Sequence, residues 1–280
     1  MTKSESSVPV ARPFLKWAGG KTQILDKLLG LLPSQFGTYY EPFVGGGAVF
    51  FALAAENRFQ RAVLNDYNQE LMDCYRVIRD FPDDLVNLLG TLPFGKAEFE
   101  RLKSLRPQDM TPVTRAARTI YLNKTGFNGL YRVNQIRGEF NVPFGQWKRP
   151  PKILDEPNLR ACAEVLNRYV ALYAADFVDV LNDAGPEDVV YFDPPYVPVS
   201  ASSNFRSYTS KGFGLKDQQR LVAVFKELAS RGVKVMASNS DTDLTRALYE
   251  GFEVHEVQAR RCINSKGSSR GPVGELIVVG

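Results

Sequence analysis

Asp193, Pro194, Pro195 and Tyr196 directly follow the apolar segment Val189–Phe192. Proline has no backbone N–H, so the two prolines remove two hydrogen-bond donors from this turn. The turn offers acceptors, the Asp193 carboxylate and a proline carbonyl, which suit a ligand that donates two N–H bonds, such as an amino group. Tyr196 adds a flat face on which a planar base can stack. The alternative is a proline-rich turn that only closes a strand.

A glycine-rich turn lies upstream, in the stretch EPFVGGG (41–47). Glycines between a strand and a helix let a ligand approach the backbone closely. Asp66 follows Gly45 by 21 residues, at the end of the next expected strand. A carboxylate at that place can accept both hydroxyls of a ribose. The pattern is not G-x-G-x-x-G, so it indicates a nucleoside-bearing cofactor without a dinucleotide fingerprint.

The segment PFLKWAGGKT (13–22) ends like a phosphate-binding loop. Such a loop requires a glycine five residues before the second one, and Leu15 occupies that position. The glycines are explained by a turn that caps the next helix, where residues 24–29 have apolar side chains at helical spacing. That interpretation leaves the crowding of Lys16, Trp17 and Lys21 unexplained.

Composition narrows the chemistry that the chain can perform. The 280 residues are 44% hydrophobic and 24% charged, as in a globular protein with one large domain or one domain with an insertion. The one histidine, His255, argues against a Ser-His-Asp triad and against a multi-histidine metal site, so we expect no metal. The three cysteines lie far apart, which suits a reducing cytoplasm. No apolar run approaches the length of a membrane span, and we expect residues 1–14 to form a short disordered arm.

Positive charge gathers in one part of the chain. Residues 91–152 contain twelve Lys and Arg against four acidic residues, a local charge of +8 that leaves about −4 elsewhere. This asymmetry indicates that one part of the chain faces a polyanion. The alternative is a solvated helical face.

Short apolar segments that end in polar or glycine-rich turns alternate with helical patterns. Alternation of this kind predicts an α/β fold with a doubly wound, mostly parallel sheet, and ligands bind beyond the carboxyl ends of such strands. The basic region interrupts the alternation, and we expect residues 81–152 to be an inserted domain, mainly helical with a hairpin, within a larger domain of residues 1–80 and 153–280. The expected strands are 38–43, 61–64, 169–174, 188–192 and 233–237, with 252–258 and 276–279 as an antiparallel pair, and the expected helices include 46–57, 84–92, 114–122 and 217–230.

The order of these motifs resembles the DNA adenine methyltransferases, in particular the Dam-like, D12 class, alpha group. The matching stretches are FLKWAGGK (14–21), EPFVGGG (41–47), LNDYN (64–68), the basic insertion, AADF (174–177) and DPPY (193–196). NGLYRVN (128–134) and RGEFNVPFG (137–145) are similar to the members that recognise GATC, although NQIRG is one residue longer here than in the Dam enzyme. The resemblance covers residues 12–279 and implies a Rossmann-like methyltransferase.

The resemblance also assigns roles to individual residues. Asp193, Pro194 and Tyr196 would be catalytic: the first two accept hydrogen bonds from the adenine amine, and Tyr196 stacks on the flipped base. S-adenosylmethionine would be bound by Trp17, Lys21, Glu41, Phe43, Gly45, Asp66, Asp176, Phe177 and Asp193. Double-stranded DNA would be contacted by Lys16, Asn128, Leu130, Arg132, Pro143 and Trp147, which stands where the Dam enzyme has tyrosine.

Four questions stay open at this point. The same turn chemistry permits methylation of RNA or of a protein amide, and a silent DNA-binding regulator could retain the fold. Leu130 and Pro143 could simply shape the hairpin. The enzyme could act alone or protect DNA from a cognate restriction endonuclease; in either role we expect a cytoplasmic, nucleoid-associated protein.

Overall fold

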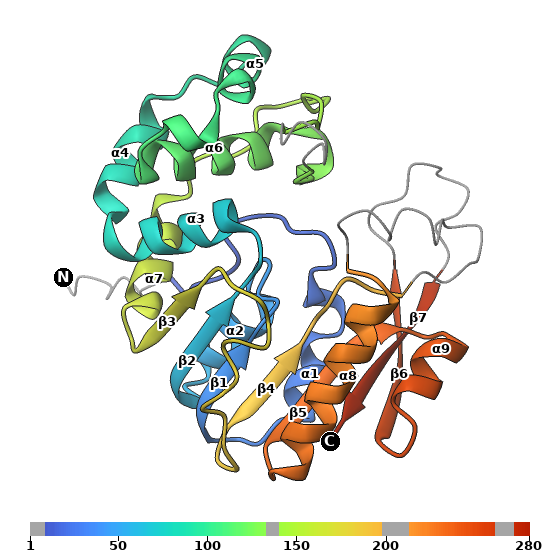
Figure 1. The fold of residues 1–280 in the computed structure, drawn as a ribbon. Coiled ribbons are helices and arrows are strands. Elements are labelled where there is room, and N and C mark those ends of the chain that lie inside the picture. The colour runs from blue at the N-terminus through green and yellow to red at the C-terminus, as the bar shows by residue number, and fades with distance from the viewer. Residues whose placement is uncertain (1–8, 133–139, 198–212, 261–271) are drawn as a thin grey trace, which may run out of the picture. The chain divides into compact units, whose positions relative to one another are not determined.

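The computed structural model describes residues 9–132, 140–197, 213–260 and 272–280 (Figure 1). Most of the expected N-terminal arm and the NQIRG part of the expected hairpin lie outside these residues. The chain forms two compact units. One consists of the described residues within 1–19, 45–56 and 68–170, and the other of the described residues within 20–44, 57–67 and 171–280.

The second unit contains a seven-stranded sheet with the strand order β3-β2-β1-β4-β5-β7-β6. β1 pairs in parallel with β2 and β4, and β4 pairs in parallel with β5, whereas β7 runs antiparallel to both β5 and β6. The strands are β1 (Phe36–Glu41), β2 (Phe59–Asn65), β3 (Val170–Tyr173), β4 (Val189–Phe192), β5 (Lys234–Ser240), β6 (Glu253–Arg260) and β7 (Pro272–Val279).

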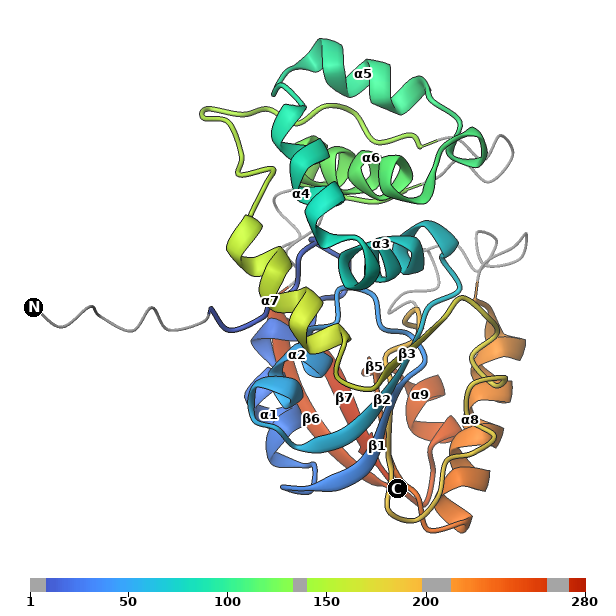
Figure 2. The ribbon, with the colours of Figure 1, turned by 90° about the vertical axis from the view of Figure 1, so that its left-hand side faces the viewer.

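Helices lie on both faces of this sheet. After the 3-10 turn η1 (Lys21–Gln23), α1 (Leu25–Gly30) lies on one face, while α8 (Leu215–Ser230) lies on the other (Figure 2). α9 (Asp243–Leu248) is on the side of α8. The predicted doubly wound, mostly parallel α/β fold is confirmed.

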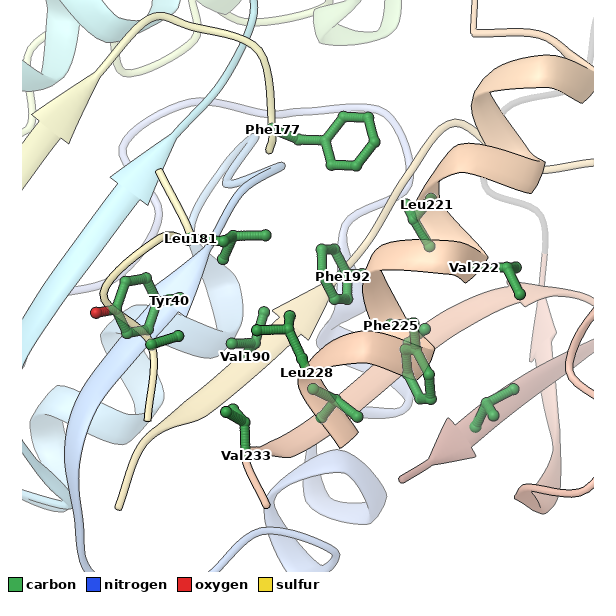
Figure 3. Packing of buried hydrophobic residues seen from close by; sticks show 14 of the residues in the cluster. Tyr40, Phe177, Leu181, Val190, Phe192, Leu221, Val222, Phe225, Leu228 and Val233 are labelled. Carbon is green, nitrogen blue, oxygen red and sulfur yellow. The ribbon is translucent and has the colours of Figure 1, made fainter. Parts of the chain in front are cut away.

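A large apolar core lies under α8 (Figure 3). Along α8, Leu221, Val222, Phe225 and Leu228 are buried because they recur at helical spacing on one face. They pack against side chains of alternate strand residues that point to this face of the sheet. These include Tyr40, Val190, Phe192, Val235, Ala237 and Val278.

The first unit is mainly helical and contains the N-terminal segment from Pro9. Asn68 and Thr111 accept hydrogen bonds from backbone N–H groups at the starts of the two helices that follow them, α3 and α6. A small core, which includes Phe99, Tyr121 and Phe140, joins two helices to the chain beyond residue 139. The helices are α2 (Ala48–Ala55), α3 (Gln69–Asp80), α4 (Pro82–Thr91), α5 (Lys96–Ser104), α6 (Pro112–Thr125) and α7 (Glu156–Leu166), with short 3-10 turns η2 (Pro107–Asp109) and η3 (Phe127–Gly129).

Each expected strand and helix is present, with ends that differ by a few residues. β5 continues to Ser240, beyond the expected end at residue 237, because its polar final residues are buried and paired with β7. His255 lies on β6, as expected for a strand residue. The compact units follow packing and leave untested the functional division into residues 81–152 and the remainder.

Candidate active site

The carboxyl ends of β1, β2, β4 and β5 meet at one edge of the sheet, because these neighbouring strands are parallel. Glu41 ends β1 and is 3% exposed. Asp66 comes directly after β2, and Asp193 comes directly after β4. Sequence analysis therefore placed the acidic motifs correctly at the carboxyl edge of the sheet, the edge at which ligands bind in folds of this class.

Asn65, the last residue of β2, fixes the loops that follow three strands. Its side-chain amide donates to the carbonyls of Pro42 (3.0 Å) and Ala175 (3.2 Å), and its Oδ1 accepts from the Ala175 N–H at 2.9 Å. Its own carbonyl accepts from the Val44 N–H at 2.8 Å. Because Asn65 is only 1% exposed, these hydrogen bonds compete little with water. The loops that carry Phe43, Asp66 and Asp176 are thus fixed to one another.

An aromatic cluster lies between two of these loops. The ring centroids of Phe43 and Phe177 are 5.3 Å apart, and Phe213 packs on both. Arg220 of α8 forms an ion pair with Asp176 and lies over the Phe177 ring, 4.6 Å from its centroid. The residues predicted to flank the cofactor adenine are therefore together, and Arg220 is an addition that sequence analysis missed.

Asp193 sits in a polar cluster at the end of β4. Lys21, which is 5% exposed, places Nζ 2.8 Å from one carboxylate oxygen. The other oxygen accepts a hydrogen bond from the Ser238 hydroxyl at 3.0 Å. Lys21 also lies over the Tyr196 ring, 4.8 Å from its centroid, and the Tyr196 hydroxyl donates to Glu275 at 3.2 Å.

Burial is the main cause of a raised pKa for Asp193, and it outweighs the lowering by Lys21, Ser238 and Tyr196. The raised pKa of Tyr196, which also comes mainly from burial, keeps its hydroxyl protonated. When it is ionised, Asp193 accepts hydrogen bonds from Ser238 and Lys21, while the protonated Tyr196 hydroxyl donates to Glu275.

Two buried amides fix the backbone of the DPPY turn. Gln218 of α8 donates to the Pro195 carbonyl at 2.8 Å, and its Oε1 accepts from the Asn239 amide at 3.1 Å. Asn239 in turn accepts from the Val197 N–H at 3.0 Å. Gln218 and Asn239 are 2% and 1% exposed. The turn is held from α8 and β5, so its shape does not depend on a bound ligand.

The first unit holds the other predicted cofactor residues. Gly45 has φ +48°, and a Cβ atom there would lie 2.7 Å from Cδ1 of Trp17. The Gly45 carbonyl accepts from the Tyr75 hydroxyl at 3.0 Å. Gly47 has φ +70°, and its Cβ would lie 2.7 Å from that same hydroxyl. Glycine is required here both for the left-handed backbone and for the close approach of Trp17 and Tyr75.

Asn123 connects two predicted DNA-contacting segments of the first unit. Its Oδ1 accepts from the Lys16 N–H at 3.0 Å, and its amide donates to the Lys16 and Gly129 carbonyls, both at 2.8 Å. Asn123 is fully buried in α6. Lys16 is exposed, and its side chain lies against Gly129, the residue after Asn128, which has φ +56°. Sequence analysis missed Asn123, whose partner Lys16 lies 107 residues away.

The remaining predicted DNA contacts differ in what their side chains already bind. Nε of exposed Arg132 donates to Asn141 at 2.8 Å, which leaves further guanidinium donors at the surface. Pro143 is exposed, and Leu130 packs at the edge of the small core. Trp147 donates its indole N–H to the Thr125 carbonyl at 2.9 Å, so only its ring remains for a ligand.

Ion pairs engage half of the basic residues between positions 91 and 152. Six of the twelve Lys and Arg in residues 91–152 form ion pairs: Arg101, Lys103, Arg106, Arg115, Arg118 and Lys152. Within the described ranges, Lys96, Arg132, Lys148 and Arg149 form none and are exposed. The positive charge available to a polyanion is therefore smaller than the count of basic residues suggests. Three of these four residues lie within 132–149.

The part of the chain that the structure describes contains neither a metal-binding cluster nor a membrane-spanning helix. No group of three or more His, Cys, Asp or Glu there is arranged to hold a metal ion. No helix there is long and apolar enough to cross a membrane.

Fold and site together define an α/β protein in which a turn at the end of β4 presents hydrogen-bond acceptors beside an aromatic ring. A family model for D12 class N6 adenine-specific DNA methyltransferases matches residues 17–263, and the chain belongs to this family. The resemblance stated from the motifs is confirmed, and so is the adenine-specific DNA methyltransferase class.

Named relatives match over nearly their whole length. The Type II methyltransferase M1.LlaDCHI of Lactococcus lactis subsp. cremoris is 44% identical, with 95% of this chain and 94% of the relative covered. The Type II methyltransferase M.MjaIII of Methanocaldococcus jannaschii is 43% identical, with 92% and 95% covered. The DNA adenine methylase of Salmonella typhi is 39% identical, with 96% and 95% covered.

Proposed function

We propose that this protein transfers a methyl group from S-adenosylmethionine to the exocyclic N6 amine of adenine in duplex DNA, within GATC, after flipping the base out of the helix. The observation that carries the proposal is the DPPY turn. Its Asp193 carboxylate and proline carbonyls are acceptors, two backbone donors are absent, and Tyr196 stands beside them. The family and its DNA substrate class support this assignment.

The residues of the second unit fit S-adenosylmethionine. Asp66 stands at the end of β2, where ribose hydroxyls can be accepted. Phe43, Asp176 and Phe177 form an aromatic and acidic surface for an adenine ring. Lys21 supplies a cation for the methionine carboxylate. Trp17, Glu41, Gly45 and Asp193 complete the proposed cofactor set.

When bound, S-adenosylmethionine supplies an electrophilic methyl group. The amine lone pair of adenine is delocalised into the ring, so the amine is a poor nucleophile. Hydrogen bonds from the amine to Asp193 and the Pro194 carbonyl favour a pyramidal nitrogen, which frees the lone pair for attack. Tyr196 stacks on the flipped base and holds it in line.

For DNA recognition we propose residues 81–152 as the target-recognition domain, with residues 1–80 and 153–280 catalytic. Lys16 and five residues of this domain contact DNA. Arg132 can read a guanine through two hydrogen bonds in the major groove. The other four are Asn128, Leu130, Pro143 and Trp147.

Transfer of labelled methyl to defined duplexes tests the proposal. One duplex contains GATC, and a second replaces the GATC adenine of both strands by 2-aminopurine, which still pairs with thymine but has no amine at C6. We expect label only in the first, and a rise in 2-aminopurine fluorescence on binding of the second if the base is flipped. Asp193→Ala should abolish transfer and preserve DNA binding.

Other outcomes would redirect the assignment. Label in RNA or in a protein amide, with none in DNA, would favour the alternative methyltransferase. Substantial turnover by Asp193→Ala would remove the role given to Asp193. The relatives are named both Type II methyltransferase and DNA adenine methylase, so pairing with a cognate restriction endonuclease and solitary action both stay open.

A further inference from the structure

Two hydroxyl groups are buried beside Asp193, and the proposed chemistry does not use them. Tyr191 and Ser238 are each 0% exposed. Their oxygens lie 2.8 Å apart, and the Ser238 oxygen lies 3.0 Å from Asp193 Oδ1. Burying a hydroxyl is unfavourable unless it is hydrogen-bonded, so the arrangement needs an explanation beyond packing.

Strand register brings the three side chains together. β4 and β5 are parallel, with Tyr191 opposite Met236 and Phe192 opposite Ala237. One residue further on, Asp193 stands beside Ser238. Alternation puts Tyr191, Asp193 and Ser238 on the same face of the sheet. Phe192 and Ala237 point to the other face, into the apolar core under α8 (Figure 3).

The chemistry of the groups fixes the direction of the hydrogen bonds. An ionised carboxylate only accepts, so the Ser238 hydroxyl donates to Asp193. That leaves the Ser238 oxygen to accept from the Tyr191 hydroxyl. Burial, followed by the nearby Asp193, raises the pKa of Tyr191 well above its ordinary value, which keeps this hydroxyl protonated.

We propose that Tyr191 and Ser238 form a positioning relay that fixes the plane of the Asp193 carboxylate, so that its free lone pairs point at the target amine. A carboxylate has about four lone-pair sites. Ser238 occupies one on Oδ1 and Lys21 occupies one on Oδ2. The remaining sites are held in a defined direction before the base arrives. This inference rests on the proposed function, because it assigns Asp193 the role of accepting the amine.

The relay has a signature in pH dependence. Loss of the Ser238 hydroxyl removes one of the contacts that lower the Asp193 pKa, so the pKa rises further. Since the ionised form is the active one, the acidic limb of the rate profile moves to higher pH. The other titratable or charged groups that face this cluster stay in place: Lys21, Tyr39, Glu41, Tyr191, Tyr196 and Glu275.

The experiment compares Ser238→Ala and Tyr191→Phe with two controls. Tyr249→Phe is the matched control for Tyr191→Phe. Tyr249 belongs to the core under α8, and its buried hydroxyl has no hydrogen-bond partner among the described residues. Ser238→Thr keeps the hydroxyl. Single-turnover methyl transfer is measured against pH, with KM for S-adenosylmethionine and thermal unfolding in parallel.

Ser238→Ala should lower kcat about ten- to a hundredfold, as expected for one lost hydrogen bond to a charged group, with little change in KM. Tyr191→Phe should act in the same direction but less, because it affects Asp193 through Ser238. Both should shift the acidic limb upward, while Tyr249→Phe leaves kcat and the profile unchanged and Ser238→Thr restores them.

Two results would overturn the relay: a wild-type kcat in Ser238→Ala, or a lower stability of both variants with an unmoved acidic limb. If Ser238→Ala does not fold, an unchanged pH–rate profile in Tyr191→Phe would overturn the relay. Failure of the proposed function looks different, since Asp193→Ala would then retain transfer. An inactive Asp193→Ala together with a normal Ser238→Ala would reject only the relay.

Discussion

Gly129→Ala should damage DNA recognition through Lys16 without touching the DPPY turn. Gly129 has φ +66°, a conformation that costs a residue with a Cβ atom about 1–2 kcal/mol. The new Cβ would also lie 2.6 Å from Lys16 Cδ and 2.8 Å from Lys16 Cβ. The distal Cδ can move aside, but the Lys16 Cβ is one bond from a backbone that Asn123 holds at both its N–H and its carbonyl. Overpacking of this kind costs about 1–3 kcal/mol more.

Gly251→Ala provides the matched control. Gly251 has φ +91°, and a Cβ atom there meets nothing within 4 Å. It therefore incurs the backbone cost of about 1–2 kcal/mol alone, whereas Gly129→Ala should lose about 2–5 kcal/mol in total. Urea unfolding of both variants, compared at unchanged slope, measures the difference.

Methylation rates on GATC and on duplexes with one changed base pair complete the test. We expect Gly129→Ala to discriminate less between them, while Gly251→Ala discriminates like the wild type. Equal stabilities for the two variants, or wild-type discrimination by Gly129→Ala, would refute the argument that this glycine holds Lys16 in place.

Four further outcomes are expected. Lys16→Ala should impair discrimination among DNA sites and leave S-adenosylmethionine binding nearly intact. Lys21→Ala should weaken S-adenosylmethionine binding and leave that discrimination nearly intact. Titration calorimetry measures cofactor binding, and competition between DNA duplexes measures discrimination. Arg132→Ala should weaken discrimination at one base pair by about 1–3 kcal/mol, and an unchanged site preference would contradict its assigned role. Because burial raises the pKa of Asp193, activity should be lost on acidification at a higher pH than for an ordinary aspartate. The stability that the protonated form of Asp193 contributes should be lost as the pH rises through the raised pKa. A pH–rate profile and unfolding measured over the same pH range check both directions. Asn123→Ala removes the partner of the part-buried Lys16 N–H and carbonyl and of the buried Gly129 carbonyl, at about 1–3 kcal/mol for each group left unsatisfied, and circular dichroism melting should show the loss.

Local signals were enough to predict the framework of the second unit. Apolar segments that end in polar turns predicted the strands. The parallel arrangement then required Asp66 and Asp193 to lie at one edge, and they do. These predictions succeeded because they depend on alternation along the chain and on a rule about strand ends, both of which are visible in a single sequence.

Supporting residues were not predictable in the same way. In the sequence, Ser238 is only a polar residue at the end of a strand. Its hydrogen-bond partner Asp193 lies 45 residues earlier in the chain and becomes a neighbour only through the register of β4 and β5. Asn123 reads as one polar residue in an ordinary helix. The +8 charge was visible, and so was the i,i+3 spacing of four of its ion pairs. The pairs of Arg115 with Asp73 and of Arg118 with Glu70 join residues far apart in the chain, so they depend on the fold. The cofactor and DNA residues stay predictions until ligands are bound.

The hydrogen bonds of Gln218 and Asn239 that hold the DPPY turn also make one backbone amide a reporter of the conformation of this turn. The Val197 N–H is buried and bonded to the Asn239 side chain rather than to a strand or helix partner. Exchange of this N–H with deuterium therefore requires its hydrogen bond to Asn239 to break. Asn239 is itself hydrogen-bonded to Gln218 of α8, so that contact is disturbed too. The exchange rate of this single amide measures how often the turn leaves its active shape, in the absence of any substrate.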